Sequence, residues 1–217
     1  MNRPTPPDGD SDSALTAFQI QVARLFFALP ASHGFLLAGG AALLAQHLTT
    51  RPTQDLDFFT RSGAGNVPAA ADALEDAATE RGWTVERHTG TDTFCRLVIH
   101  GPEDLLVDLA VDAAPGRPPT ASFIGPTFAP DELAGRKLIA LFDRAAARDF
   151  ADVYVLALRY TKQQLLDEAA ALDAGFDPHV LAQMMAALDR FRDSDIAVAP
   201  DQIAPLRQFF HDWRHEL

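Results

Sequence analysis

Two aspartates separated by a single residue inside an apolar segment are the feature that most constrains this chain. In the segment RPTQDLDFF, Asp55 and Asp57 alternate with Leu56 and Phe58. Alternate side chains of a strand share a face, so a strand here would place both carboxylates on one side and both apolar residues on the other. Burying two ionised carboxylates side by side is unfavourable unless positive charge lies between them. The segment therefore predicts a strand that presents a cation site.

A later β-like segment, DLLVDLAVD, offers a further carboxylate. Asp108 lies among apolar residues, and Asp112 falls on the same face nearer the end of the segment. Carboxylate oxygens are preferred ligands of Mg²⁺, and sets of three on neighbouring strands hold metal ions for phosphoryl or nucleotidyl transfer. We expect a magnesium site formed by Asp55, Asp57 and Asp108, with Asp112 as the alternative third carboxylate.

A glycine pair precedes the aspartate segment. Gly39 and Gly40 follow the short apolar stretch FLLA and lead into AALLAQHL, which has a helical pattern. Backbone N–H groups at a strand-to-helix junction attract phosphate oxygens, and glycine allows close approach. A glycine pair alone is a weak signal, but the order of glycine pair, paired aspartates and further aspartate is more specific.

The composition of the chain excludes several kinds of protein and of binding surface. The formal net charge of −12 argues against a broad surface for nucleic acid, although it allows a local basic groove. Cys95 is the only cysteine, so neither an internal disulfide nor a cysteine-based zinc site is expected. No apolar run approaches the ~20 residues of a membrane span. We expect a cytoplasmic protein with no membrane partner and no signal peptide, and a disordered tail at residues 1–13.

Hydrophobic periodicity divides the rest of the chain into two halves, an α/β half at 14–128 and a helical half at 129–217. Ser13 is the predicted cap of the first helix, and Pro68 is predicted to open a later one. The predicted elements are helices at 13–29, 41–48 and 69–81, strands at 33–38, 55–59, 83–90, 93–101 and 104–112, an extended segment at 114–128, and helices at 131–160 (broken once), 161–174, 178–192 and 205–215.

Basic residues crowd into the start of the helical half. Lys137, Arg144 and Arg148 recur at helical spacing, which would align them on one face opposite the acidic strand and suit them to a triphosphate. Asp149 and Asp152 lie in the same segment, and either could be a site carboxylate. The plainer alternatives are a solvated helix face for the cations, an exposed acidic strand edge for the aspartates and an ordinary turn for the glycines.

Two segments resemble a known family. LLAGGAALLAQHLTTRPTQDLDFFT resembles the opening motif of the polymerase β-like nucleotidyltransferase superfamily, and more narrowly of the AbiEii/AbiGii-type toxin nucleotidyltransferases. ELAGRKLIALFDRAAARDFADVYVLAL is similar to the Lys…Arg…Asp segment of that family. The resemblance covers residues 34–158. It implies an α/β (α+β) fold, with a polymerase β-like nucleotidyltransferase core built on a mixed sheet and followed by a C-terminal helical bundle.

The resemblance also implies a role for each matching residue. Asp55 and Asp57 would hold Mg²⁺, and Asp108 would be the third metal carboxylate, which can activate the acceptor hydroxyl in relatives. Gly39 and Gly40 would contact the triphosphate, and Gly40 stands where relatives often carry serine. In the helical segment the matching positions are Lys137 and Arg144 for nucleotide binding, and Asp149, with Asp152 one turn away, for the last family aspartate.

The function implied is transfer of a nucleoside monophosphate from an NTP to an acceptor hydroxyl, by the toxin of a bacterial toxin–antitoxin or abortive-infection system. The acceptor would be the 3′ end of tRNA or a protein, and a cognate antitoxin would be a partner. One alternative is an aminoglycoside-type nucleotidyltransferase, for which an acidic surface would favour cationic substrates. Another is a non-catalytic nucleotide-binding module. The presence of Asp55, Asp57 and Asp108 favours an enzyme over this module.

Overall fold

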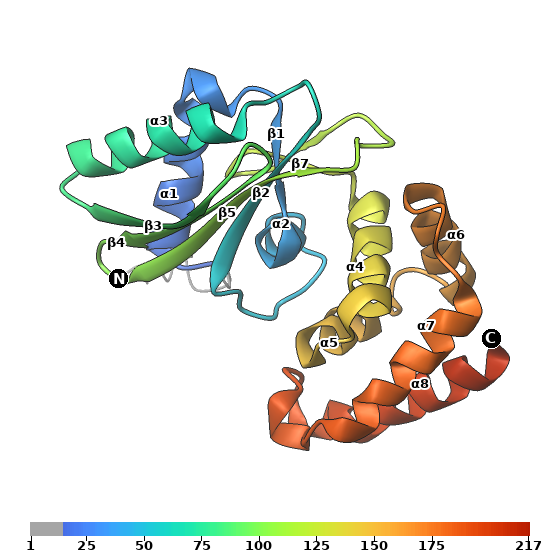
Figure 1. Ribbon diagram of the computed structural model, residues 1–217. Helices are drawn as coiled ribbons and strands as arrows, with labels where there is room; N and C mark the ends of the chain where they lie inside the picture. The colour runs from blue at the N-terminus through green and yellow to red at the C-terminus, as the bar shows by residue number, and fades with distance from the viewer. Residues whose placement is uncertain (1–14) are drawn as a thin grey trace, which may run out of the picture.

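The computed structural model describes residues 15–217, and the tail predicted at residues 1–13 lies outside the described residues. A mixed sheet with flanking helices is formed by the first part of the chain, and a group of helices is formed by the second (Figure 1). This arrangement confirms the predicted fold class of a mixed-sheet α/β core followed by helices.

The sheet has seven strands within the described residues. They are β1 (Phe35–Ala38), β2 (Asp55–Arg61), β3 (Thr84–Gly90), β4 (Phe94–His100), β5 (Asp104–Asp112), β6 (Thr120–Ala121) and β7 (Pro126–Thr127). Their order is β3-β4-β5-β2-β1-β7-β6, with β2 parallel to β5 and antiparallel to β1. All five predicted strands are present, and the extended segment at 114–128 adds the short pair β6 and β7.

Strand β2 has an apolar side and a polar side, as its alternating sequence predicts. Leu56 and Phe58 are fully buried. Phe58 stacks on Phe26 of helix α1 (Ala17–Ala28), with ring centroids 4.1 Å apart. Helix α3 (Val67–Glu80) covers the same side of the sheet as α1 (Figure 1). Asp55 and Asp57 therefore lie on the opposite side of β2, which faces the second half of the chain.

Capping side chains determine where α1 and α3 begin. The hydroxyl of Thr16 accepts a hydrogen bond from the backbone N–H of Gln19, so Thr16 is the cap of α1 and the helix begins at Ala17. The predicted cap, Ser13, lies outside the described residues. The side chain of Asn66 caps α3 in the same way, and Pro68 lies in the first turn. Both caps satisfy N–H groups that have no partner inside the helix.

The remaining helices include the predicted break. Ala145 adopts a left-handed conformation (φ 45°), which ends the first long helix of the second half and separates it from the next. The predicted helix at 178–192 is α-helical only in its first part and continues as a 3-10 turn. The helices are α2 (Gly39–Ala45), α4 (Pro130–Arg144), α5 (Ala147–Leu156), α6 (Lys162–Leu172), α7 (Pro178–Met185) and α8 (Ile203–Glu216).

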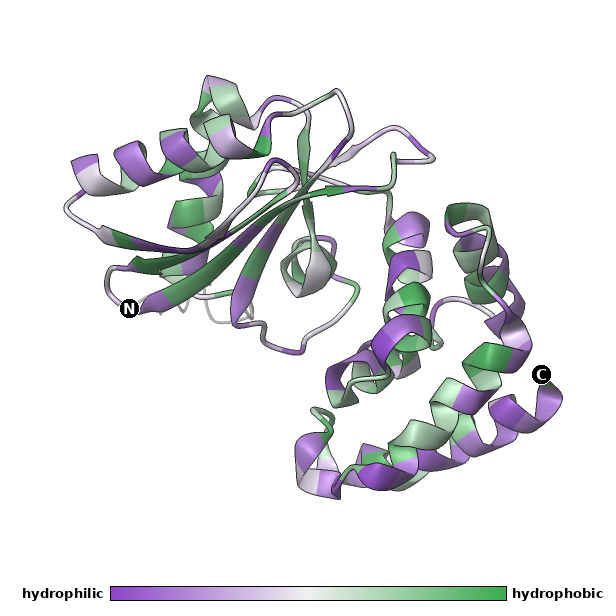
Figure 2. Cartoon of the chain, in the orientation of Figure 1, coloured by the Kyte–Doolittle hydropathy of each residue, from purple (hydrophilic) through white to green (hydrophobic). Residues whose placement is uncertain are grey.

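Hydropathy follows this architecture. The central strands are mostly hydrophobic, whereas α3 and α8 alternate between hydrophobic and hydrophilic residues, as amphipathic helices do (Figure 2). The buried apolar side chains form one cluster that includes Leu56 on β2, Leu138 on α4 and Phe210 on α8, so the sheet and the helices share a core. Among residues 15–217, no helix is both long and apolar enough to cross a membrane.

Candidate active site

One row of residues crosses four strands of the sheet. The register pairs Ala38 on β1 with Asp57 on β2, Asp57 with Asp108 on β5, and Asp108 with Arg96 on β4. Neighbouring strands lie about 4.8 Å apart, so the side chains of such a row are within reach of one another. This register makes Asp108 the strand neighbour of Asp57. Asp112 lies further along β5, where Arg136 Nη1 contacts its carboxylate at 2.8 Å.

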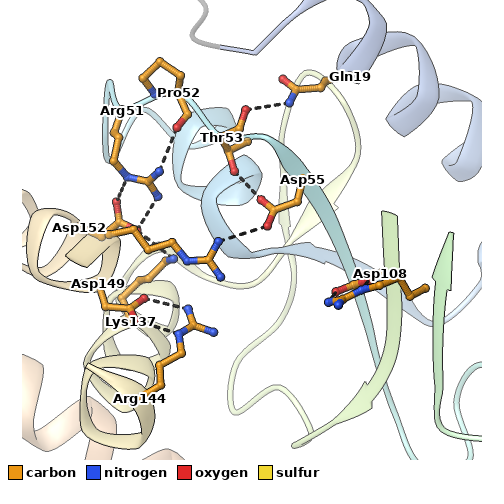
Figure 3. Close-up of polar contacts among 12 residues, drawn as sticks. Gln19, Arg51, Pro52, Thr53, Asp55, Asp108, Lys137, Arg144, Asp149 and Asp152 are labelled. Atoms are coloured by element: carbon orange, nitrogen blue, oxygen red, sulfur yellow. Dashed lines mark hydrogen bonds and ion pairs between the residues drawn. The ribbon is translucent and has the colours of Figure 1, made fainter. Parts of the chain in front are cut away.

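Asp55 is oriented by a chain of hydrogen bonds that starts on α1 (Figure 3). The hydroxyl of Thr53 donates to Asp55 Oδ1 at 2.6 Å. The backbone carbonyl of Thr53 accepts a hydrogen bond from Nε2 of the buried Gln19 at 2.9 Å. On the other side, Arg148 Nη1 lies 3.5 Å from Asp55 Oδ2. Thr53 thus fixes one carboxylate oxygen and leaves the other facing the cationic helices.

The negative charge of Asp57 is less well compensated than that of Asp55. Desolvation raises the pKa of Asp57 to about 6, and the negative charge of Asp55 adds to the rise, while Lys137 opposes it. Among the described residues, no hydrogen-bond donor contacts its oxygens. A divalent cation between Asp55 and Asp57 would remove both the repulsion and the desolvation penalty. The donor chemistry of these two residues therefore fits a magnesium ion.

Asp108 does not join the two carboxylates in this conformation. Arg96 donates from Nε to Asp108 Oδ1 at 2.8 Å and from Nη2 to Oδ2 at 2.6 Å, so both oxygens are engaged. Within residues 15–217, no group of three or more His, Cys, Asp or Glu side chains is arranged to hold a metal ion. The predicted role of Asp108 as third metal ligand stays a prediction, and it requires the ion pair between Arg96 and Asp108 to separate.

The glycine pair fits closely against the aspartate strand. Gly39 has a φ of 62°, and a Cβ atom on it would lie 1.8 Å from Asp57 Oδ2. A Cβ atom on Gly40 would lie 2.7 Å from Thr53 Oγ1. A side chain at either position would thus collide with the groups that form the site. The structure explains why both residues are glycine, and their contact with a triphosphate stays a prediction.

Across from the aspartates of β2, a buried carboxylate on helix α5 holds two cations. Asp152 on α5 has no exposed side-chain surface and accepts hydrogen bonds from Arg51 Nε at 2.8 Å and Nη2 at 2.9 Å. The Nζ atom of Lys137 on α4 lies 2.9 Å from Asp152 Oδ2. Burial tends to raise the pKa of Asp152, but the hydrogen bond from Arg51 and the charge of Lys137 outweigh it and lower the pKa below its usual range. Asp152 is therefore the ionised anchor of both cations.

Asp149 plays the same part for Arg144. Its fully buried carboxylate accepts hydrogen bonds from Arg144 Nε at 2.9 Å and Nη2 at 2.8 Å, and from the backbone N–H of Ala146 at 3.2 Å. The break at Ala145 puts Arg144 at the end of α4 and Arg148 in α5, so the cations do not share one continuous helix face as predicted. Neither Asp149 nor Asp152 lines the cleft, and both lie behind the cations that do.

The two walls enclose a cleft of about 730 Å³. Its sheet side contributes Asp55, Asp57 and Asp108, and the start of α2 contributes the two glycines. The side formed by α4 and α5 contributes Lys137, with Arg144 and Arg148. The cleft can therefore hold a metal ion and a polyanion at the same time, because opposite charges face each other across it.

Three functional candidates were missed at the level of sequence: Thr53, Gln19 and Arg96. Thr53 lies two residues before Asp55, so its proximity could have been inferred from local sequence alone. Arg96 interrupts the apolar strand β4, and the short turn between β4 and β5 sets the register that places it opposite Asp108. Gln19 has no local signal, since it reaches the site from α1 across the fold.

A mixed sheet whose paired aspartates face a cationic helical wall is the arrangement expected of a nucleotidyltransferase. The chain belongs to the AbiEii family, because the family described as "Nucleotidyl transferase AbiEii toxin, Type IV TA system" matches residues 22–215. The chain is thus a nucleotidyltransferase of a toxin–antitoxin family, as its sequence motifs predicted.

Solved structures have the same fold at low sequence identity. JHP933 from Helicobacter pylori is 18% identical, with a TM-score of 0.58 over 91% of this chain and 90% of that one. MenT4, a nucleotidyltransferase toxin from Mycobacterium tuberculosis H37Rv, is 17% identical, with a TM-score of 0.57 over 96% of this chain and 87% of that one. No curated protein matches the chain.

Proposed function

We propose that the protein transfers a nucleoside monophosphate from an NTP to an acceptor hydroxyl in a Mg²⁺-dependent reaction, as the toxin of its toxin–antitoxin pair. The observation that carries this proposal is the position of Asp55 and Asp57. They lie on one face of β2, in a cleft whose other wall is cationic, and Asp57 has no donor among the described residues. Such a pair is unfavourable unless a cation is bound.

Asp55 and Asp57 would hold the metal, which when bound supplies charge neutralisation and lowers the pKa of a coordinated hydroxyl. Thr53 keeps Asp55 in the orientation that leaves Oδ2 open to the cleft. Asp108, once released by Arg96, would act as the third carboxylate and accept the proton of the acceptor hydroxyl. The hydroxyl oxygen then bonds to the α-phosphorus, the bond from that phosphorus to the bridging oxygen breaks, and pyrophosphate leaves.

The cations of the opposite wall would bind the triphosphate. Lys137 and Arg144 line the cleft, and the half-exposed Arg148 reaches toward Asp55. Gly39 and Gly40 bring the backbone at the start of α2 close enough for phosphate contact. Asp149 and Asp152 act through these cations as positioning residues, because each is buried behind the cation that it holds. Fixed cations stabilise the leaving pyrophosphate more effectively than mobile ones.

The acceptor proposed is the 3′ end of tRNA or a protein hydroxyl. A net charge of −12 leaves only a local surface for RNA, which suits a strand end better than a long duplex. The family implies an antitoxin partner and an NTP substrate. With these substrates and partners, we place the protein in the cytoplasm.

The test is a transfer assay with purified protein, MgCl₂, each α-³²P-labelled NTP in turn, and total tRNA. Wild-type protein should label tRNA or a protein band, and Asp57→Asn should lower the rate by about a thousandfold or more, since it removes one carboxylate from the metal site. Asp76→Asn is the matched control, because the same charge change then falls on an exposed residue of α3, away from the cleft. It should leave the rate unchanged.

The pattern of labelling decides between acceptors. Labelled RNA identifies tRNA, and labelled protein with unlabelled RNA identifies a protein hydroxyl. If no acceptor is labelled with any NTP, and wild-type protein binds Mg²⁺–NTP no better than Asp57→Asn in calorimetry, the proposed metal-dependent transfer is wrong.

A further inference from the structure

A proposed metal ligand on the sheet wall, Asp108, forms an ion pair with Arg96. Asp108 is only 9% exposed, and its two oxygens receive two parallel hydrogen bonds from Arg96. Such bidentate pairs are geometrically specific and strong. In the same row of the sheet, Asp57 is the neighbour of Asp108 on the other side. Asp108 therefore stands between a cation that is present, Arg96, and the position of the proposed metal ion.

Arg96 can leave this pair without disturbing the core. Its side chain is 44% exposed and lines the cleft, and its guanidinium lies 5.6 Å from the centre of the Phe94 ring. No other hydrogen bond of Arg96 ties it down among the described residues. Asp108, by contrast, is confined by the central strand β5. The mobile member of the pair is thus the arginine.

We propose that Arg96 is a positioning residue that competes with the divalent metal for Asp108. In the resting protein Arg96 engages both carboxylate oxygens of Asp108, so the site offers two metal ligands and not three. Binding of the metal displaces Arg96 from Asp108 and completes the site. This inference rests on the proposed metal site at Asp55 and Asp57, and it assigns a role to a residue that the proposed mechanism does not otherwise need.

Competition of this kind has a direct thermodynamic consequence. A metal ion that takes Asp108 as a ligand must first break two charge-assisted hydrogen bonds, so Arg96 weakens metal binding by the net free energy of its pair with Asp108. Removing Arg96 should then tighten metal binding by more than the loss of one positive charge from the sheet would alone. The tightening must vanish when Asp108 is also removed, because the two residues act on the same step.

The experiment is a titration of the nucleotide-free protein with MnCl₂, in which free Mn²⁺ is quantified by electron paramagnetic resonance. Wild type, Arg96→Gln, Asp108→Asn and the double variant form one cycle. We expect Arg96→Gln to bind Mn²⁺ about tenfold more tightly than wild type, and the double variant to bind no more tightly than Asp108→Asn. Arg96→Lys, which keeps the charge but not the bidentate geometry, should fall between wild type and Arg96→Gln.

Arg87→Gln is the matched control. Arg87 lies on the neighbouring strand β3, is paired with Asp72 and Glu75, and does not line the cleft. The Arg87→Gln substitution removes the same charge from the sheet. Any increase in Mn²⁺ affinity that it causes therefore measures the effect of the lost charge at long range, without a direct contact to the site. Thermal unfolding of each variant shows whether it is folded at the titration temperature, and Arg96→Lys provides the comparison if Arg96→Gln is not.

The outcomes separate this inference from the proposed function. If wild type binds Mn²⁺ and Asp57→Asn does not, but Arg96→Gln and Arg96→Lys bind as wild type does, Arg96 is a static cross-strand partner and the competition is disproved. The same conclusion follows if the tightening persists without Asp108 or is matched by Arg87→Gln. If wild type and Asp57→Asn bind Mn²⁺ equally, with and without NTP, the metal site itself is wrong.

Discussion

The two walls of the cleft neutralise their charges in different ways. On the helical wall, each buried carboxylate has its cation: Asp152 holds Arg51 and Lys137, and Asp149 holds Arg144. On the sheet wall, Asp57 has no donor among the described residues, and desolvation raises its pKa to about 6. The buried carboxylates of the helical wall are thus neutralised without a ligand, whereas the charge of Asp57 on the sheet wall is not.

This difference separates stability from function. Ion pairs to the buried carboxylates Asp149 and Asp152 hold the cations in place before a substrate arrives, and removing the carboxylate destabilises the fold. An uncompensated carboxylate does the reverse, since it lowers the stability of the metal-free protein and is relieved only by the proposed cation. We therefore expect substitutions of the buried carboxylates Asp149 and Asp152 to weaken folding, and substitutions at Asp57 to strengthen it while removing activity.

The largest effect on stability is expected for Asp152→Asn. The substitution keeps the volume of the side chain but leaves Arg51 and Lys137 without their shared anion, which should lower the free energy of unfolding by about 3–5 kcal/mol. Urea denaturation followed by circular dichroism measures the change. Asp143→Asn, on the exposed side of α4 and without an ion pair among the described residues, should shift stability by no more than about 0.5 kcal/mol. If both variants lost the same free energy of unfolding, the ion pairs of Asp152 would not be the source of the stability.

The next effect is a gain in stability for Asp57→Asn in the metal-free protein. The pKa of Asp57 is raised from 3.8 to about 6, so the folded protein binds a proton more tightly than the unfolded chain. Stability from this group is therefore fully present below about pH 4 and is lost as the pH rises through about 6. At pH 7.5 with EDTA, Asp57→Asn should be more stable than wild type by about 1–3 kcal/mol.

Urea denaturation at pH 7.5 and pH 5 tests the sign of this effect. The advantage of Asp57→Asn over wild type should shrink at pH 5, since Asp57 is then mostly protonated. Asp76→Asn, the exposed control on α3, should show no such difference between the two pH values. A wild type that is more stable than Asp57→Asn at pH 7.5 would mean that the carboxylate is compensated in the metal-free protein.

A smaller effect is expected for Thr53→Val, which keeps the shape of the side chain but removes the hydrogen bond to Asp55. Groups that orient metal ligands typically contribute tenfold or more to metal affinity or activity. We expect the transfer rate at limiting Mg²⁺ to fall about tenfold and to recover in part at high Mg²⁺. Thr53→Ser retains the hydroxyl and should behave as wild type does. If the transfer rate fell by the same factor at all Mg²⁺ concentrations, Thr53 would not act by orienting a metal ligand.

The smallest effect on stability is expected for Arg148→Gln. Its guanidinium is half exposed and 3.5 Å from Asp55, so the pair should contribute less than about 1 kcal/mol to folding. If Arg148 binds the triphosphate, the KM for NTP should nevertheless rise about tenfold, because a charge-assisted contact to phosphate is lost. Steady-state kinetics and urea denaturation of one preparation measure both. An unchanged KM would remove Arg148 from the nucleotide site.

Local sequence patterns predicted much of the site. The alternation around Asp55 and Asp57 predicted both the strand and the face that each side chain occupies, because a strand has a fixed period of two. One break within the helical segment 131–160 was also predicted, without its position, and the structure places it at Ala145. The cap of α1 is Thr16, three positions after the predicted Ser13. Both residue types can cap a helix, and Gln19 at the third helical position completes a capping box with Thr16.

Local sequence patterns could not predict which cation each carboxylate pairs with. The sequence indicated Asp149 as the site carboxylate, with Asp152 as the alternative, and only the packing of α5 shows that both lie behind cations. The pair of Arg96 and Asp108 depends on the register of β4 against β5. The pair of Arg51 and Asp152 joins segments that are far apart along the chain.

The sequence by itself determined the class of fold, the family and the carboxylates that face the cleft. These follow from short-range periodicity and from motifs whose residues are close together in the chain. Only the tertiary structure decided which charges are already paired and which are free for a ligand. Ion pairing depends on distances between side chains that strand register and helix packing bring together, and electrostatic energy changes steeply with those distances and with burial.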